Sequence, residues 1–328
     1  MTPLKELGEQ KIIDLLTQWL PTREDVMVGS GDDTAVLDQV GSPYDLLLTS
    51  DPVIENIHFL PRTPGDQVGH KAVARALSDI AAMGGEPLWV LINIVAPAST
   101  ETAYLEKIYG GMRQLLETFN TTIVGGDIAE GPTLEIHVFT AGRVPKETAV
   151  LRSGAHVGDI LYVTGTLGYS WPHKHLHFTP RIKEGRWLRE HGDVTSMIDL
   201  SDGLATDLRH ITEKSQVGAE LWESHIPIAQ KENHVNDTCT PLEHAFYDGE
   251  DYELLFTVPA EKKETFEKNR YPGSELSCTA IGHITPEKNI IKCVQEQGKS
   301  WSLEAKGFEH FQIQRSLHKR RGSDCTKL

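Results

Sequence analysis

The sequence predicts a two-domain protein of the α/β (α+β) class. With 328 residues the chain is long enough for two hydrophobic cores, and 39% hydrophobic with 24% charged residues is ordinary for a globular protein. Strand-like and helix-like segments alternate in the first half, as they do in α/β domains. The turn-rich segment RSGAHVGD, residues 152–159, then precedes a new strand-like run, ILYVTG. We therefore expect a domain boundary near residue 150.

The expected elements of the first domain, residues 1–150, follow from hydrophobic periodicity. An amphipathic helix is expected over residues 4–20, where apolar residues recur at helical spacing; they are Ile12, Leu15, Leu16 and Trp19. Further helices are expected over residues 68–83 and 100–119, and strands over 44–50, 88–95, 121–124 and 134–144. Gly84 and Gly85 form a typical helix stop signal.

The second domain, residues 151–315, mixes both kinds of element. Strands are expected over residues 160–165, 196–200, 252–258 and 277–284, and helices over 180–191 and 204–214. Residues 316–328 are basic and polar, and we expect a frayed, disordered tail there.

Composition excludes several classes of function. A formal charge of −15 disfavours nucleic acid as a partner, because binding to it depends on basic side chains. No apolar run approaches the ~20 residues of a membrane span, and the N-terminus is unlike a secretory signal. The four cysteines are far apart and form no CxxC pair, which argues against a disulfide framework and a zinc ribbon. We therefore expect a cytoplasmic protein that binds neither membranes nor nucleic acid.

Aspartates recur beside glycine or hydroxyl residues at the ends of the expected elements. They occur in GSGDDTAVL (Asp32, Asp33), LLLTSD (Asp51), ALSDIAAMGG (Asp79), IVGGD (Asp127), IDLSDGL (Asp199, Asp202) and YDGEDYEL (Asp248, Asp251). Magnesium prefers hard oxygen ligands and often takes a few carboxylates together with substrate phosphates. The alternative for each single aspartate is a turn, in which the side chain bonds its own backbone.

Some of these residues are hard to explain as turns. Asp79 interrupts a small apolar stripe of its helix, where a carboxylate is costly unless a cation meets it. Thr49 and Asp51 share one face of a strand and so resemble a metal-ligand pair. Asp199 and Ser201 repeat that spacing just before a helix, whose free N–H groups would also favour a phosphate. The pattern indicates a site for magnesium ions and a nucleotide.

Other phosphate and metal motifs fail on inspection. The GKS at residues 298–300 lacks the first glycine of a P-loop, because Cys293 stands in its place. His173, His175 and His177 form an HxHxH cluster that could bind zinc. No cysteine or acidic partner has motif spacing nearby, so a solvated loop is expected over residues 173–177 instead.

Together these segments resemble the thiamine-monophosphate kinase family of the aminoimidazole-ribonucleotide-synthetase-like superfamily. The matching segments are GSGDDTAVL, TSDPVIENIHF, HKAVARALSDIAAMGGEP, GGDIAEGP, RSGAHVGDILYVTGTLG, IDLSDGL, GEDYELLF and KGFEHF. Each is weak alone, but their order and spacing are specific. The resemblance implies a two-domain synthetase-like fold, in which the N-terminal domain forms a homodimer and the ATP site. It also implies a phosphotransferase that converts thiamine monophosphate to thiamine diphosphate with ATP and several Mg²⁺ ions.

The resemblance further implies a role for individual residues. Magnesium would be held by Asp33, Thr49, Ser50, Asp51, Asp79, Asp127, Asp199 and Asp202. ATP would be bound by Tyr109, Gly126, Asp127, Arg152 and Ser201, and thiamine monophosphate by His58, Glu250 and Phe308. No residue is expected to act as a general acid or base, because the acceptor phosphate is already ionised and direct in-line transfer suffices. Asp32, Asp248 and Asp251 are expected outside the metal shell.

Three of these residues also have a structural explanation. Arg152 could form a surface ion pair, His58 could be a core histidine, and Phe308 could anchor the C-terminal segment. The segment from Gly168 to Pro180 is short for the family and is expected to lie away from the metals.

Related functions fit the sequence less well. Selenophosphate synthetase would need a reactive residue near the N-terminus, yet the first cysteine is Cys239. Hydrogenase-maturation dehydratases need a C-terminal cysteine, whereas Cys325 is followed by three more residues. Aminoimidazole ribonucleotide synthetase does not share the NIHF and GEDYEL segments. A non-catalytic nucleotide sensor would be expected to have lost acidic ligands, and every family aspartate is present here.

Overall fold

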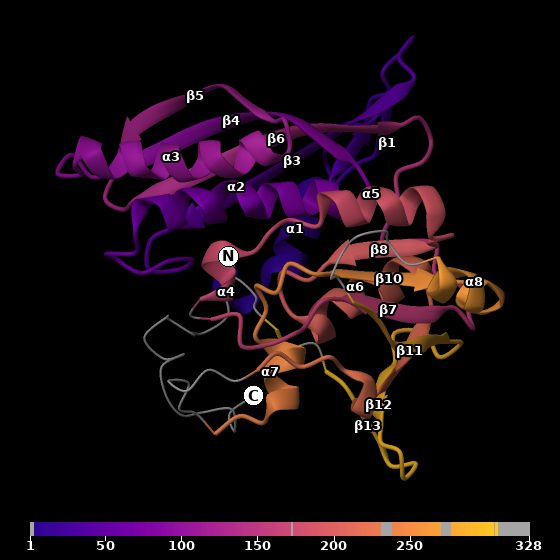
Figure 1. The fold of residues 1–328 in the computed structure, drawn as a ribbon. Helices are drawn as coiled ribbons and strands as arrows, with labels where there is room; N and C mark the ends of the chain where they lie inside the picture. The colour runs from indigo at the N-terminus through magenta and orange to yellow at the C-terminus, as the bar shows by residue number, and fades with distance from the viewer. Residues whose placement is uncertain (1–2, 172, 231–237, 270–276, 305, 308–328) are drawn as a thin grey trace.

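The computed structural model describes residues 3–171, 173–230, 238–269, 277–304 and 306–307, and its strands form two sheets (Figure 1). The first sheet has the order β1-β2-β3-β6-β4-β5. Its strands are β1 (Val26–Val28), β2 (Ala35–Leu37), β3 (Tyr44–Ile54), β4 (Glu86–Ala96), β5 (Thr122–Glu130) and β6 (Glu135–Pro145). The pair β4–β5 is parallel and the other pairs are antiparallel. On this edge of the long β3, only residues 46–48 pair with the short β2.

The second sheet has the order β13-β12-β9-β11-β7-β10-β8. Its strands are β7 (Ile160–Thr164), β8 (Ser196–Asp199), β9 (Gly218–Trp222), β10 (Leu254–Val258), β11 (Cys278–Thr285), β12 (Ile291–Val294) and β13 (Ser300–Ser302). Here β9 and β12 are parallel neighbours and the other pairs are antiparallel. The helices α6 (Leu204–Ser215), α7 (Pro241–Tyr247) and α8 (Lys263–Lys268) belong to this half.

The helix α2 (Gly65–Ala82) lies at the centre of the molecule, between the first sheet and the second half (Figure 1). It packs against α3 (Thr102–Thr118) and α5 (Ile182–His191). A Cβ atom added at Gly69 would lie 1.9 Å from the carbonyl oxygen of Ile108, and one added at Gly111 would lie 1.9 Å from that of Asp66. The backbones of α2 and α3 therefore touch directly, and only glycine fits at these two positions.

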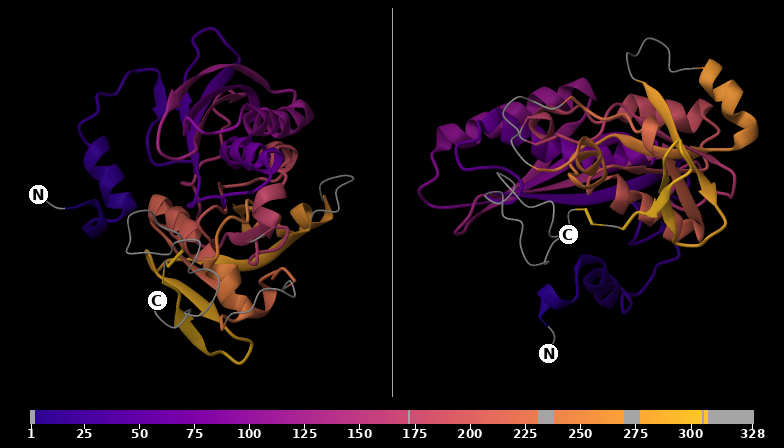
Figure 2. Two further views of the ribbon diagram at one scale, coloured as in Figure 1. Left: turned by 90° about the vertical axis from the view of Figure 1, so that its left-hand side faces the viewer. Right: turned by 90° about the horizontal axis from the view of Figure 1, so that it is seen from below.

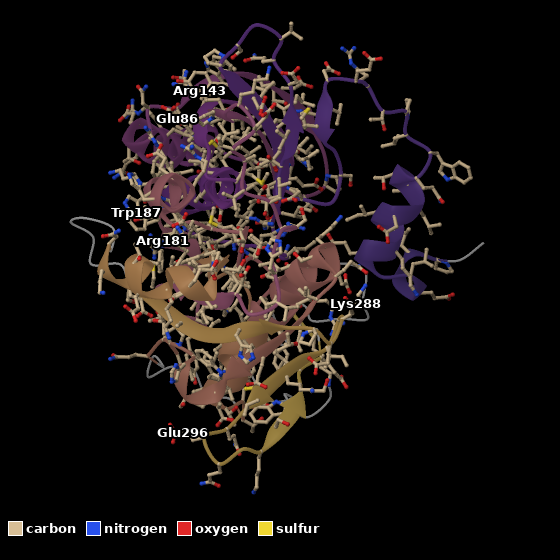
Figure 3. All side chains as sticks on the ribbon, turned by 90° about the vertical axis from the view of Figure 1, so that its right-hand side faces the viewer. Glu86, Arg143, Arg181, Trp187, Lys288 and Glu296 are labelled. Atoms are coloured by element: carbon tan, nitrogen blue, oxygen red, sulfur yellow. The ribbon has the colours of Figure 1, made fainter. Side chains whose placement is uncertain are left out.

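One buried apolar cluster runs through both halves of the chain. It joins Leu47 and Ile92 of the first sheet to Leu77 of α2, and continues to Met197 and Phe256 of the second sheet. Figure 3 shows Arg181 and Trp187 on the flank where the two halves meet, with Glu86 and Arg143 on the first sheet above them. The first sheet ends at Pro145 and the second begins at Ile160. Because the core is shared, the division into domains 1–150 and 151–315 stays a prediction.

Apart from the N-terminal helix, the long predicted helices and strands are confirmed, with ends that differ by a few residues. Sequence periodicity missed the short strands β1, β2, β9, β12 and β13, and the helices α7 and α8. The strand predicted over residues 121–124 is longer than expected, because β5 continues through Gly125, Gly126 and Asp127 to Glu130. Asp127 therefore lies within a strand rather than after one.

The N-terminal helix and the cysteines also differ from expectation. A 3₁₀ turn (Leu4–Glu6) and α1 (Glu9–Thr17) replace the single long helix, and α1 stands off the main body (Figure 2). Only Ile12 of its predicted apolar stripe is buried, whereas Trp19 beyond its end is 80% exposed. Cys278 and Cys293 are free, whereas Cys239 is disulfide-bonded, a bond that the cysteine spacing did not predict. Within the described ranges, no helix combines the length and the apolarity needed to cross a membrane.

Candidate nucleotide and metal site

Three carboxylates converge where α2 meets both sheets. Asp33 lies in the loop between β1 and β2, Asp79 in the last turn of α2, and Asp199 at the end of β8. One oxygen of each lies within 4.8 Å of an oxygen of the other two. Ser78 of α2 donates its Oγ–H to Asp199 Oδ2 at 2.6 Å and so links the helix to the second sheet. A cation placed among these carboxylates would meet three hard oxygen ligands.

Burial raises the pKa of all three carboxyl groups, and repulsion by neighbouring carboxylates adds to the shift at Asp79 and Asp199. Burial, followed by the charge of Asp33, raises the pKa of Asp199 to about 7. Burial, followed by the charges of Asp51 and Asp199, raises the pKa of Asp79 well above its ordinary value. The pKa of Asp33 is raised by burial, although Arg152 opposes the shift. A positive charge between the groups would remove this penalty and favour their ionised form.

Protein donors orient all three carboxylates and leave one buried oxygen, Asp33 Oδ2, without a partner among the described residues. Thr49 Oγ1 donates to Asp79 Oδ2 at 2.5 Å, and Arg152 Nη2 donates to Asp33 Oδ1 at 2.7 Å. Asp33 Oδ2 is buried and has no hydrogen-bond partner within the described part of the chain. The potential metal ligands around this point are carboxylate and hydroxyl oxygens, and the guanidinium group of Arg152 lies beside them. This set of ligands fits a hard divalent cation such as Mg²⁺.

The predicted ligands of β3 divide between its two faces. Thr49 and Asp51 share the face that packs toward α2, as the strand period requires, whereas Ser50 lies on the opposite, exposed face. Arg75 of α2 donates its Nη2–H to Asp51 Oδ1 at 3.2 Å. Arg75 was missed by the sequence analysis, although Lys71, Arg75 and Asp79 are spaced by four residues and so share one helix face.

The loop before α6 forms a second acidic group. One ligand atom each of Asp202, Asp207 and His210 lie within 4.8 Å of one another. Burial, followed by the charge of Glu9, raises the pKa of Asp202 to about 7. Asp207 Oδ2 accepts the backbone N–H groups of Asp202 and Gly203 at 3.1 Å each. These two N–H groups, which precede α6, are therefore already satisfied by a protein acceptor, and a phosphate at the start of the helix stays a prediction.

A buried lysine brings together the residues predicted to bind the acceptor. Lys71 Nζ donates to the carbonyl oxygen of His58 at 2.7 Å and to Glu250 Oε1 at 2.6 Å. The backbone N–H of Glu250 donates to the carbonyl oxygen of Ser201 at 2.7 Å, so this group adjoins the metal side of the site. Phe308, the third residue predicted to bind the acceptor, lies outside the described residues.

The HxHxH cluster is not a solvated loop. Residues 174–177 form the short helix α4 (Lys174–His177), and His175 is completely buried. Its Nδ1 lies 2.6 Å from Lys71 Nζ and 3.1 Å from Glu250 Oε2. The prediction of a solvated loop is wrong because a charged partner in α2, 104 residues away in sequence, binds the central histidine.

Two predicted residues lie on the far edge strand of the first sheet, and a third lies on the helix α3. Asp51 on β3 is opposite Val138 on β6, Val138 is opposite Ile92 on β4, and Ile92 is opposite Gly126 on β5. Three strand spacings thus separate Asp51 from the β5 residues Gly126 and Asp127, or about 14 Å. Tyr109 lies on α3 and is 39% exposed. Within one chain these residues do not join the three converging carboxylates.

The three aspartates expected outside the metal shell accept hydrogen bonds from protein groups. Asp32 accepts the backbone N–H of Asp33 at 3.0 Å, and Asp248 accepts that of Tyr169 at 3.1 Å. Asp251 accepts the Ser170 hydroxyl and the backbone N–H of Gly168, the latter at 3.0 and 3.1 Å.

Comparison with known proteins identifies the family. A family model of the N-terminal domain of AIR synthase related proteins matches residues 31–144, and one of the C-terminal domain matches residues 173–293. Thiamine-monophosphate kinase of Haemophilus influenzae is 34% identical over 328 aligned residues, which cover 93% of this chain and 98% of the relative. The chain belongs to the thiamine-monophosphate kinase family.

Other members of the thiamine-monophosphate kinase family show the same match in sequence and fold. The enzyme of Aquifex aeolicus is 32% identical, with 94% of this chain and 99% of the relative covered. The solved structure of AaThiL complexed with AMPPCP and TMP has a TM-score of 0.79 at 31% identity, and the match covers 94% of this chain and 99% of that one. Asp33, Asp79 and Asp199 all lie within the ranges matched by the two family models.

Proposed function

We propose that this chain transfers the γ-phosphoryl group of ATP to thiamine monophosphate, which gives thiamine diphosphate and ADP. The convergence of Asp33, Asp79 and Asp199 beside Arg152, in a chain of the thiamine-monophosphate kinase family, carries the proposal. A relative solved with AMPPCP and TMP supports the choice of both substrates. ATP as co-substrate also fits a cytoplasmic location.

We assign several Mg²⁺ ions to the acidic residues of the site. The proposed ligands are Asp33, Thr49, Ser50, Asp51, Asp79, Asp127, Asp199 and Asp202. When bound, these ions would neutralise the phosphates and align the reacting groups. The buried Asp33 Oδ2, which has no hydrogen-bond partner among the described residues, supports a cation at this point. Ser50, whose side chain lies on the other face of β3, would contribute a backbone oxygen.

The chain's own residues bind and orient the substrates in this proposal. An ionised phosphate oxygen of thiamine monophosphate attacks the γ-phosphorus, and the bond from that phosphorus to the β–γ bridging oxygen breaks as ADP leaves. No side chain has to remove a proton, because the attacking oxygen is already ionised. Arg152 presents a planar fork near the cluster that can meet a phosphate as well as Asp33. Ser201 lies between the metal side and Glu250, where it would meet ATP.

We propose that the working assembly is a homodimer whose sites use both copies. Nearly all residues of β5 are exposed, and β5 pairs only with β4 among the described strands. The sheet has a second edge that is unpaired among the described strands, which is β3 beyond residue 48, because β2 ends there. The outer face of the sheet exposes Trp89, Leu91 and Phe139. Pairing these edges across a two-fold axis would bring Asp127 of the partner subunit beside Asp51.

One assay tests the proposed function. Purified protein is incubated with ATP, Mg²⁺ and thiamine monophosphate, and we expect equal amounts of thiamine diphosphate and ADP by chromatography. Chelation of Mg²⁺ should stop the reaction. Asp51→Asn and Asp127→Asn should each abolish turnover with an unchanged circular dichroism spectrum. Tight Mg-ATP binding without any thiamine diphosphate would contradict the kinase function and favour a nucleotide sensor.

A further inference from the structure

The ammonium group of Lys71 is the meeting point of three distant segments. Lys71 is 0% exposed, and its Nζ lies 2.7 Å from the His58 carbonyl oxygen, 2.6 Å from His175 Nδ1 and 2.6 Å from Glu250 Oε1. These acceptors come from the loop after β3, from α4 and from the segment before β10. An ammonium group has three N–H donors and can therefore serve all three of these acceptors from the described part of the chain.

This geometry fixes the protonation of the histidine ring. An ammonium group can only donate, so His175 Nδ1 must accept from Lys71, and the ring proton lies on Nε2. The 3.1 Å approach of Glu250 Oε2 to the same Nδ1 is then a contact beside the ring rather than a hydrogen bond. The positive charge of Lys71 holds the Glu250 carboxylate in this position.

The segment that carries His175 is itself held firmly. The ring of Trp171 lies against that of His175, with centroids 4.1 Å apart. Lys174 Nζ donates to the carbonyl oxygen of Thr166 at 2.9 Å and forms an ion pair with Glu253 at 3.2 Å. Through His175 of α4 this segment contacts Glu250 on the predicted acceptor side, and its expected place away from the metals stays a prediction.

Glu250 needs such support because its backbone is strained. Its φ is +58°, in the left-handed region that side-chain residues rarely adopt. Its side chain is 15% exposed, whereas that of Lys71 is completely buried. A ligand can therefore reach the carboxylate but not the ammonium group.

We propose that Lys71 and His175 are positioning residues of the acceptor site, which fix Glu250 and the backbone at His58 without touching the substrate. The inference rests on the proposed function, which assigns Glu250 and His58 to thiamine monophosphate. It gives the central histidine of the HxHxH cluster a role, and it makes the link between α2 and α4 a determinant of acceptor binding.

Steady-state kinetics separate positioning from a general structural role. Lys71→Met keeps the stem and removes the charge, so the KM for thiamine monophosphate should rise about tenfold to a hundredfold, with the KM for ATP within about twofold. His175→Phe should also raise the KM for thiamine monophosphate. His175→Asn should keep this KM close to the wild-type value, because its amide oxygen occupies the place of Nδ1. His177→Gln is the matched control, since His177 is exposed, and it should leave both KM values unchanged.

Three results would overturn the inference. They are equal changes in both KM values, a loss of thermal stability with both KM values unchanged, and no difference between His175→Phe and His175→Asn. If Lys71→Met does not fold, the pair of His175 variants decides. A wild-type enzyme that makes no thiamine diphosphate would instead contradict the proposed function.

A second measurement does not depend on activity. In ¹⁵N-histidine-labelled protein, long-range ¹H–¹⁵N spectra at neutral pH should show the ring proton of His175 on Nε2, with the signals assigned from their loss in His175→Asn. Lys71→Met should change this pattern, because Nδ1 loses its donor. A ring proton on Nδ1 in the wild type would contradict the inference whatever the enzyme's activity.

Discussion

At the scale of single residues, the converging carboxylates of Asp33, Asp79 and Asp199 repel one another in a buried space. Asp79→Asn removes one charge and keeps an oxygen to accept from Thr49. We expect the metal-free variant to melt about 1–2 °C higher than the wild type, because a gain near 1 kcal/mol has that effect in a chain of 328 residues. The stabilisation that Mg²⁺ gives the wild type should disappear. Thermal melting after dialysis against a chelator, with and without added Mg²⁺, measures both effects.

Asp45→Asn is the control for this experiment. Asp45 is buried on the same strand as Thr49, but its Oδ2 accepts the backbone N–H of Glu147 at 2.8 Å, away from the three carboxylates. This variant should lose stability and keep its response to Mg²⁺. An Asp79→Asn protein that is less stable than the wild type without metal would show that repulsion among the carboxylates is not a dominant effect.

Residue types and local spacing predicted part of the site and could not predict the rest. Asp79 was suspected because it interrupts an apolar stripe, and the structure places it among other carboxylates. Lys71 was missed, because its partner Glu250 lies 179 residues away in sequence. Spacing shows which residues share a helix face, but not which distant segment packs against that face. The same limit explains the wrong prediction of a solvated loop around His175.

At the scale of elements, the contact between α2 and α3 depends on one of two adjacent glycines. A Cβ atom at Gly111 would lie 1.9 Å from the carbonyl oxygen of Asp66, whereas one at Gly110 would meet nothing within 4 Å. Gly111→Ala should therefore lower the free energy of unfolding by about 1–3 kcal/mol, because the helices must separate. Gly110→Ala should raise it by about 0.5–1 kcal/mol, because alanine favours the helix.

Urea denaturation of the two variants, one residue apart on the same helix, measures this difference directly. Equal effects of both substitutions would contradict the close contact between α2 and α3. A stabilising Gly111→Ala would do the same, since helix propensity would then be the only effect left.

Elements with a long hydrophobic period were predictable, and the shortest strands were not. The helix α2 and the strands β3, β4 and β6 carry enough periodic residues to be found from the sequence. The strands of three residues, β1, β2 and β13, are too short to show a period. The strand β5 was cut short in the prediction because its Gly-Gly pair looks like a turn, while ladder pairing with β4 keeps it extended.

At the scale of the whole molecule, one apolar cluster joins the two sheets, while the second sheet also packs a separate cluster of its own against α6 and α7. The apolar cluster that includes Leu77 of α2 joins both sheets, and this arrangement leaves the site at their junction. Sequence periodicity could predict two groups of elements but not that they share a core, because a helix buried on all sides looks the same in either case. The far position of Asp127 likewise could not be seen from its motif.

The position of Asp127 leads to a test of the whole assembly. If each site combines Asp51 of one copy with Asp127 of the other, Asp51→Asn and Asp127→Asn should each be inactive alone. In a mixed dimer, one site then carries both substitutions and the other carries none. Subunits unfolded together and refolded in equal amounts should recover about a quarter of wild-type activity, because about half of the dimers are mixed and each has one intact site.

The control is an equal mixture of Asp51→Asn and Asp79→Asn. The proposed site takes both of these residues from the same copy, so every site of a mixed dimer carries one substitution and no activity should return. Recovery in the first mixture alone would establish that the site is shared between copies. Activity absent from both mixtures, with dimers present by light scattering, would place Asp127 outside the site, because its distance from Asp51 within one chain excludes a direct role there.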